Sequence, residues 1–443
     1  MMLNNARPVE INGKFEENFA SDPALSAKRL MLTRTALEEA SFDAIAAGKM
    51  QFAFSKEVKT LPVTNQLSSG RCWIFAALNV LREKTAKELG LSNLEFSQNY
   101  IAFWDKLEKI NYFLESILDT ADREPDDRTV SFLLQTGIAD GGQWDMIVAL
   151  IKKYGVVPKT AMPETYQSSH TAIMNRMLNM RLREMAAALR DAKNAGKDTA
   201  ALKDAFLQEM YNALVICFGE PPKSFDFEYT DKNGVYHVER DLTAKAFYDK
   251  YVGIDLSEYV SIINAPTPDK PFGKTFTVKY LGNVIGADPI LYYNVEMDTL
   301  KDLIMKQLND DEVVWFGSDV GKFGARKEGI WDKACFGYET VLSMPLTITK
   351  QQQLMYRDSA MTHAMVITGY NVGKDGSPDR WKIENSWGED RGSKGYYVMG
   401  AEWFDQYVYQ AVIHKKYLSA EILEKLSDEP IALEPWDPMG SLA

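Results

Sequence analysis

The sequence predicts an α+β fold, in which a mostly helical first part precedes a β-rich second part. The strongest helical pattern lies in residues 168–218, where apolar side chains recur every three or four positions. From about Asp226 onward, short runs rich in Tyr, Val and Ile alternate with turn residues, as in strands. Helices and strands segregated along the chain are typical of the α+β class.

Charge and composition narrow the function. The 443 residues are 46% hydrophobic, enough for a large core, and 62 acidic against 50 basic side chains give a net charge of −12. This balance argues against nucleic acid as a partner, because phosphate binding needs clustered Lys and Arg. A local basic patch stays possible, since net charge does not show where charges lie.

The cysteines and the termini indicate the compartment. Three cysteines far apart, with no CxxC spacing, form neither a disulfide framework nor a zinc site. The first residues have no basic head followed by an apolar run, and no stretch approaches the ~20 apolar residues of a membrane span. We therefore expect a cytoplasmic protein that does not enter a membrane.

The first predicted helix begins at Cys72. Ile74, Leu78 and Leu81 lie on one face, and Gly90 provides a stop. A second helix is expected over 94–118, and an acidic, Pro-containing loop follows it. The next helix comes after the pair Gly141 and Gly142.

Two long antiparallel helices are predicted within 168–218, with a break at "NAGKD". Cys217 is interpreted as a buried structural thiol that extends the second apolar stripe, while Cys335 is interpreted as structural or exposed. The stripes indicate helix packing, and they could also form subunit contacts. Two strands are predicted as the arms of a hairpin in 369–387, and two more at 395–400 and 410–418.

Cys72 is the candidate nucleophile. A thiol at a helix N-terminus faces the positive end of the helix dipole, which is expected to lower its pKa. For a lone cysteine, however, a small buried hydrophobe is the more common role. The rest of the sequence must therefore supply a base.

Four histidines are available as that base. His170, His237 and His414 are interpreted as packed or surface residues. His363 begins an apolar strand, and 22 residues later Asn385 could hydrogen-bond its imidazole while Trp387 excludes water.

Four motifs carry a family resemblance. "NQLSSGRCW", "THAMVITGY" and "ENSWG" resemble, in this order, the Gln, Cys, His and Asn blocks of papain-like cysteine proteases. The "GG" before Trp144 resembles the segment of those enzymes that pairs with substrate backbone. The resemblance implies a papain-like fold, with no metal and no organic cofactor. It also implies that Cys72 is the nucleophile, His363 the base and Asn385 the amide that orients the base. Gln66 would be an oxyanion donor, and Gly141 and Gly142 would bind the substrate. The two glycines could instead form only a tight turn.

Two departures point to one branch of these proteases. Ser69 stands where secreted members carry a disulfide cysteine, and His363 lies 291 residues beyond Cys72, so a long insertion must separate the halves. The chain, including "SDVGKFGARKEGIWD" and the tail "EPWDPMGSLA", resembles the bleomycin hydrolase and aminopeptidase C family. That resemblance implies a homohexamer and a C-terminal arm whose carboxylate, on Ala443, receives the amino terminus of the substrate.

The tail also has predictions of its own. Pro435, Pro438 and Gly440 oppose a helix, so an extended arm anchored by Trp436 is expected. The alternative is an ordinary frayed terminus.

The predicted organisation has four parts. Residues 1–160 form a helical half, 161–225 a helical insertion that could drive oligomerisation, 226–430 a β-rich half and 431–443 the arm. The predicted function is a cysteine aminopeptidase that acts on short peptides with broad specificity. An endopeptidase of the papain type is the alternative if the arm is not docked, and a nucleic-acid-binding protein is an alternative of another class.

Overall fold

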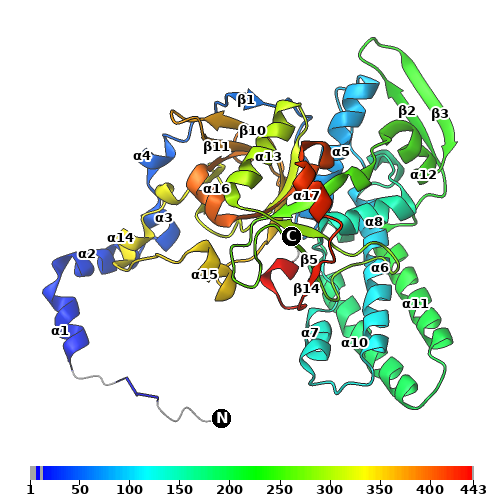
Figure 1. Ribbon diagram of the computed structural model, residues 1–443, viewed down its shortest axis with the longest axis horizontal. Coiled ribbons are helices and arrows are strands. Elements are labelled where there is room, and N and C mark those ends of the chain that lie inside the picture. The colour runs from blue at the N-terminus through cyan, green and yellow to red at the C-terminus, as the bar shows by residue number, and fades with distance from the viewer. Residues whose placement is uncertain (1–5, 10–12, 442–443) are drawn as a thin grey trace.

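The computed structural model describes residues 6–9 and 13–441. Its helical side is built on α5 (Cys72–Leu89), which is buried along most of its length. Gly90 closes this helix in the left-handed region at φ 67°, as the sequence predicted. Helices α6 (Gln98–Asp119), α7 (Arg128–Thr136) and α8 (Trp144–Tyr154) complete this side (Figure 1).

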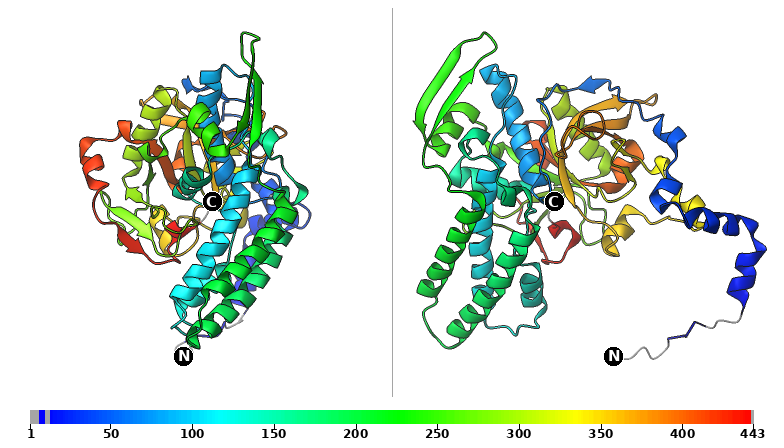
Figure 2. Two further views of the ribbon diagram at one scale, coloured as in Figure 1. Left: turned by 90° about the vertical axis from the view of Figure 1, so that its right-hand side faces the viewer. Right: turned by 180° about the vertical axis from the view of Figure 1, so that it is seen from behind.

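The predicted helical hairpin is confirmed. After the short α9 (Tyr166–Ser169), α10 (Ala172–Asn194) and α11 (Ala200–Phe218) run antiparallel beside α6 (Figure 2). Cys217 is only half-buried, so the prediction of a buried thiol there is wrong. The stripe of α11 continues from Met210 and Leu214 to Phe218, which takes the buried position instead.

A large mixed sheet forms the other side. From one edge its strand order is β14, β5, β6, β4, β13, β7, β10, β11, β12, β9 and β8, and the small β1 also pairs with β10. The strands, in chain order, are β1 (Lys56–Glu57), β4 (Tyr259–Ile263), β5 (Thr275–Val278), β6 (Tyr292–Asn294), β7 (Val314–Ser318), β8 (Gly324–Ala325), β9 (Ile330–Trp331), β10 (His363–Val372), β11 (Pro378–Glu384), β12 (Tyr396–Gly400), β13 (Val408–His414) and β14 (Ile431–Leu433).

The strand β10 positions the site. It pairs antiparallel with β7, where His363 lies opposite Ser318, and with β11, where Val366 lies opposite Glu384. The hairpin predicted in 369–387 is thereby confirmed, as is the strand predicted at 395–400. The strand predicted at 410–418 corresponds to β13 (Val408–His414), and the prediction is wrong beyond His414, because Lys415–Tyr417 form a 3₁₀ turn. Because α5 packs on β10, its first residue comes close to the start of that strand.

The segment directly after Asp226 does not join the large sheet. Strands β2 (Phe225–Thr230) and β3 (Tyr236–Leu242) form a separate hairpin near α5 and α12 (Ala244–Phe247), at the helical side (Figure 1). Phe227 packs against Phe247 and Tyr251, which ties this hairpin to the residues that follow it.

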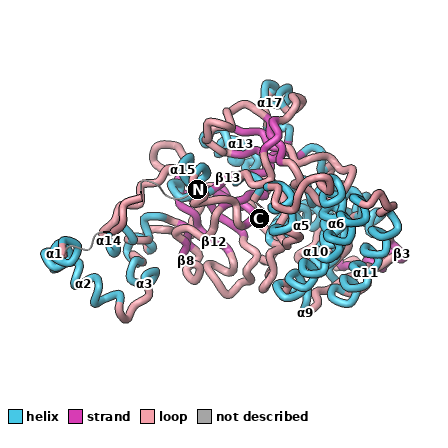
Figure 3. The backbone as a smooth tube through the Cα atoms, turned by 90° about the horizontal axis from the view of Figure 1, so that it is seen from below, coloured by secondary structure: helices cyan, strands magenta, loops and turns pink. Residues whose placement is uncertain are grey.

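Most of the remaining helices lie around the sheet, and the first two form an amino-terminal arm. Figures 1 and 3 show α1 and α2 extending away from the body, while α3 contacts α14. These helices are α1 (Lys14–Ser21), α2 (Pro23–Leu32), α3 (Leu37–Ser41), α4 (Ala44–Ala47), α13 (Met297–Asn309), α14 (Tyr338–Leu342), α15 (Lys350–Met355), α16 (Ala401–Tyr407) and α17 (Ala420–Lys425).

The tail is docked but not extended throughout. Strand β14 pairs with β5, and Pro438–Gly440 then form a 3₁₀ turn. The expectation of a wholly extended arm is wrong at this turn, because Pro438 is tolerated at the first position of a helix and Asp437 caps it through Met439 N–H at 2.8 Å. Met439 is buried, so the described part of the tail is not a frayed end.

Candidate active site

The thiol of Cys72 lies at the first residue of α5, with 2% of the residue exposed. Its Sγ accepts a hydrogen bond from the backbone N–H of Ala364, at 3.5 Å, so α5 and β10 meet at this atom. The preceding residue, Arg71, is buried and forms an ion pair with Glu164 at 2.9 Å. That ion pair holds the turn from which the helix begins.

The imidazole of His363 is oriented by an amide. Nε2 of His363 and Oδ1 of Asn385 are 2.9 Å apart, and the backbone N–H of Ser386 donates to the same oxygen at 2.8 Å. Trp387 covers this pair, with its ring centroid 4.9 Å from that of His363. Because Asn385 engages Nε2, Nδ1 is the ring nitrogen left for the thiol.

Burial controls the ionisation of both groups. It raises the pKa of Cys72 to about 11, although backbone N–H groups of Ala364, Trp73 and Cys72 itself lower it. The prediction that the helix N-terminus gives this thiol a low pKa is therefore wrong for the isolated group. Burial likewise lowers the pKa of His363 to about 4, against the raising effect of Asn385. A charged pair can form here only by proton transfer from thiol to imidazole.

Gln66 joins the two loops of the site. Its Oε1 accepts from Ser386 Oγ at 2.6 Å, and its backbone N–H donates to the Ser386 carbonyl at 2.8 Å. Its Nε2 donates to the Ser69 carbonyl at 2.6 Å, so one amide hydrogen is already engaged. Ser69 Oγ in turn accepts from Arg71 Nε at 3.0 Å. The loop before Cys72 is thus fastened to the loop that carries Asn385.

Asp140 supports the site, and the sequence analysis did not find it. Its Oδ2 accepts from the Gly70 N–H at 2.9 Å, and its backbone carbonyl accepts from Trp73 Nε1 at 2.7 Å. Both donors flank Cys72 in sequence. A lone aspartate beside a Gly pair gives no local signal of this contact.

The Asp140 carboxylate is itself held by polar partners. Lys106 Nζ lies 2.7 Å from it, Asn175 donates to it at 2.8 Å, and the Thr171 hydroxyl donates to it as well. Burial alone would raise the pKa of Asp140, but Lys106 and these hydrogen bonds lower it well below its usual range. The carboxylate therefore stays ionised.

The two predicted substrate-binding glycines have different surroundings. A Cβ on Gly142 would lie 2.6 Å from Trp73 Cε2, so this position must stay without a side chain. The Gly141 carbonyl accepts from Lys109 Nζ at 2.6 Å. Neither glycine has a positive φ, so the segment does not use the left-handed backbone conformation that favours glycine.

The tail enters the same region. Gln143 Nε2 donates to the Ser441 carbonyl at 2.6 Å, and Ser441 Oγ donates to the Met361 carbonyl at 2.6 Å. Met361 lies two residues before His363, so the tail reaches the site. A cavity of about 330 Å³ adjoins Gly440 and Ser441. Ala443, predicted to receive the substrate amine, lies outside the described residues.

Trp436 anchors the tail. The guanidinium of Arg128 lies 3.9 Å from its ring centroid, and Phe132 packs edge-on at 6.2 Å. Both residues belong to α7, which fixes the approach of the tail to the site. The predicted anchoring role of Trp436 is confirmed.

The other predicted chemistry-bearing residues lie elsewhere. His170 stacks on Tyr166, His237 pairs with Asp231, and His414 ends β13. Cys335 is buried. Within residues 6–9 and 13–441, no cluster of three or more His, Cys, Asp and Glu could hold a metal ion. No helix in this described part is long and apolar enough to cross a membrane.

Comparison with known proteins identifies the family. The model of the peptidase C1-like family matches residues 8–440. The chain belongs to the peptidase C1-like family. It is 50% identical to the aminopeptidase C of Listeria innocua over 97% of each chain, and 42% identical to human bleomycin hydrolase over 89% of this chain and 88% of that one. The crystal structure of PepW from Lactobacillus rhamnosis superposes with a TM-score of 0.96 at 46% identity, covering 98% of this chain and 99% of that one. The predicted family and the papain-like fold are confirmed.

Proposed function

We propose that this peptidase C1-like protein is a cysteine aminopeptidase that removes amino-terminal residues from short peptides. The observation that carries the proposal is the convergence of Cys72, the His363–Asn385 pair and the docked tail in one place. Relatives named aminopeptidase C, which match nearly the whole chain, support the same activity.

The proposed mechanism begins with proton transfer from the Cys72 thiol to His363 Nδ1. The thiolate attacks the peptide carbonyl, and His363 returns the proton to the leaving amine, forming an acyl-enzyme that water hydrolyses. Asn385 holds the imidazole. The Cys72 backbone N–H and the second amide hydrogen of Gln66 stabilise the oxyanion. Gly141 and Gly142 are proposed to line the acyl side of the substrate.

The tail supplies the amino-terminal specificity in this proposal. The described part of the tail passes Gln143 and Met361 beside the site, which supports a role for the Ala443 carboxylate in pairing with the substrate ammonium. A tail in this place blocks longer acyl segments, which favours exopeptidase over endopeptidase cleavage.

One comparison of substrates tests the proposal. An amino-acid amide with a free amine and its N-acetylated form are offered, under reducing conditions, to the intact chain and to a chain lacking Ala443. We expect the intact chain to cleave only the free amine and the truncated chain to lose this selectivity. Equal cleavage of both substrates by the intact chain would identify an endopeptidase instead.

Assembly and location complete the proposal. A homohexamer is supported by the hairpin, which exposes large apolar side chains: Ile173, Met177, Met180 and Ile216. A cytoplasmic location and broad specificity are proposed on the family resemblance. Light scattering after size exclusion tests the assembly, and a mass of one subunit would reject it.

A further inference from the structure

The leaving-group side of the site has its own charged residue. With the tail lying beside Gln143 and Met361, the fragment released by cleavage must leave past the other side of His363. Trp387 forms that side, because its half-buried ring packs against the imidazole that protonates the leaving amine. Side chains around Trp387 are therefore the first that the leaving fragment meets.

Arg326 lies against this tryptophan. Its Cζ is 5.1 Å from the centroid of the Trp387 ring, and the residue is exposed. Its backbone carbonyl accepts a hydrogen bond from the Tyr397 hydroxyl at 3.2 Å, and the Tyr397 ring packs edge-on against Trp387 at 5.9 Å. The loop that carries Arg326 is thus fixed relative to the catalytic imidazole.

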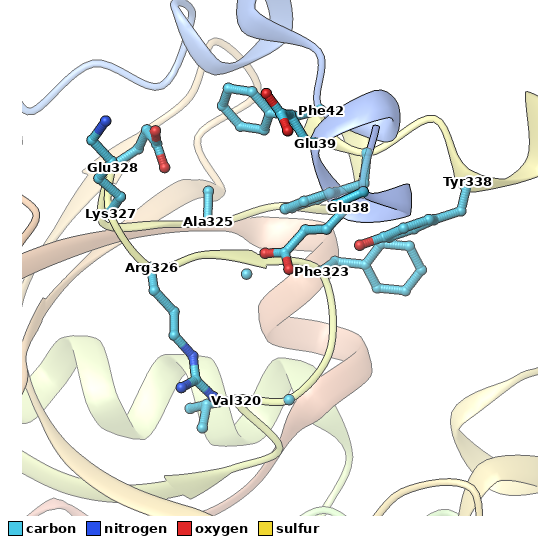
Figure 4. Close-up of a pocket in the computed structure, with 14 residues that line it drawn as sticks. Glu38, Glu39, Phe42, Val320, Phe323, Ala325, Arg326, Lys327, Glu328 and Tyr338 are labelled. Atoms are coloured by element: carbon cyan, nitrogen blue, oxygen red, sulfur yellow. The ribbon is translucent and has the colours of Figure 1, made fainter. Parts of the chain in front are cut away.

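The guanidinium has room for a ligand. No ion pair or side-chain hydrogen bond of Arg326 is found among the residues that the structure describes. It lines a cavity of about 640 Å³, in which its side chain points down from the loop toward Val320 (Figure 4). Glu38 and Glu39 of α3 line another wall, so a long acidic fragment would be repelled there.

The positive charge of Arg326 acts on His363 and lowers its pKa. After burial, it is the other influence that lowers the pKa of His363, against Asn385, which raises it. A carboxylate bound at Arg326 would therefore lie within electrostatic reach of the imidazole.

We propose that Arg326 is a specificity-determining residue that binds a carboxylate of the leaving fragment, which rests on the aminopeptidase function proposed above. A planar guanidinium that lies over an aromatic ring can still offer its N–H groups for bidentate contact with a carboxylate. The carboxylate is either the carboxyl terminus of a leaving amino acid or the side chain of an acidic residue. The first source makes the enzyme favour dipeptides.

Three substrates distinguish these sources. Alanyl-alanine presents a terminal carboxylate, alanyl-alanine amide presents none, and alanyl-aspartic acid α-amide presents only a side-chain carboxylate. We would measure kcat/KM for each at pH 7 in the parent chain, in Arg326→Gln and in Lys327→Gln. Lys327 is the matched control, because it carries the same charge in the same loop but points away from Arg326 (Figure 4).

The readout is the ratio of kcat/KM for a carboxylate substrate to that for alanyl-alanine amide. Comparing this ratio between variants cancels the basicity of the leaving amine and any change in the His363 pKa. We expect Arg326→Gln to lower the ratio about 5- to 30-fold, the range for a hydrogen-bonded charged contact. Lys327→Gln should keep the parent ratio, and Arg326→Lys should restore part of it.

A ratio unchanged in Arg326→Gln, or lowered equally in Lys327→Gln, would overturn the assignment. Loss of the preference for alanyl-alanine alone identifies the chain terminus as the ligand, and loss for the aspartyl substrate identifies the side chain. If the parent chain cleaves none of the three, the aminopeptidase proposal itself fails. Cleavage of the amide with no dependence on Arg326 rejects only the present inference.

Discussion

Cys72 and Cys335 are two buried thiols in the same chain, with 2% and 1% of their surface exposed. Burial raises the pKa of Cys72 to about 11 and that of Cys335 to about 12. Their partners differ. Cys72 receives a backbone N–H at the junction of α5 and β10, whereas the carboxylates of Asp332 and Asp43 raise the pKa of Cys335 further.

The comparison shows that burial and ionisation do not separate a nucleophile from a structural thiol. What separates them is a proton acceptor held beside the sulfur and donors aimed at its charge.

Cys72→Ala should reduce kcat/KM for an amino-acid amide by about 10⁴-fold or more, because the substitution removes the sulfur that attacks the carbonyl. Cys335→Ala is the matched control and should keep the parent rate. Circular dichroism checks that both variants are folded. Turnover that survives in Cys72→Ala would reject the proposed nucleophile.

His363→Ala should make Cys72 behave like Cys335. In the parent chain the imidazole of His363 accepts the thiol proton, and its positive charge stabilises the thiolate, which burial alone disfavours by raising the pKa of Cys72 to about 11. Alkylation of Cys72 by iodoacetamide should then be faster at neutral pH, and depend less steeply on pH, than in His363→Ala. Without His363 the thiol must lose its proton to water, and the rate should rise tenfold per pH unit up to about pH 11.

Mass spectrometry of the alkylated peptides measures each cysteine separately in one sample. Cys335 should show the steep dependence in both chains. A flat profile for Cys72 in His363→Ala would mean that another group accepts the proton.

Gln66→Ala should lower kcat by about 10²–10³-fold, the usual effect of removing one oxyanion donor. Because Gln66 also binds Ser386 and Ser69, the substitution could act by loosening both loops. Gln66→Glu narrows the cause, since it keeps the acceptor for Ser386 but loses the amide donor, including its bond to the Ser69 carbonyl. Equal rates in Gln66→Glu and the parent would show that the amide does not act on the oxyanion.

Cys335→Ala should change stability rather than rate, by about 1 kcal/mol in the free energy of unfolding. The thiol packs in a small cluster with Phe336 and Val398, and its removal leaves a modest void. Urea denaturation measures the effect. A loss of activity in the folded variant would contradict the structural role.

The sequence was sufficient for the framework of the site. The helix from Cys72, the strand from His363 and the following Asn385 follow from apolar spacing and turn residues, and the structure has them as predicted. Their convergence required the motif resemblance, because no local pattern reports a contact across 291 residues.

Other features could not be predicted. The pKa of Cys72 depends on how completely the fold covers the sulfur, which the helix-dipole argument ignores. The turn at Pro438–Gly440 forms because Asp437 caps it. The prediction of an extended tail considered the prolines and did not consider this local contact. Asp140 contacts Gly70 and Arg326 contacts Trp387, and the partners are 70 and 61 residues apart in the chain.

The contacts of Asp140 limit how the helical hairpin can be shortened by protein engineering. The Asp140 carboxylate accepts hydrogen bonds from the Gly70 N–H, just before the nucleophile, and from Thr171 and Asn175 at the start of α10. A smaller enzyme made by deleting the hairpin would therefore lose two hydrogen-bond donors to Asp140, the residue that holds the loop before Cys72. Shortening the hairpin should be attempted only at its far end, around residues 194–200, where no such joint exists among the described contacts.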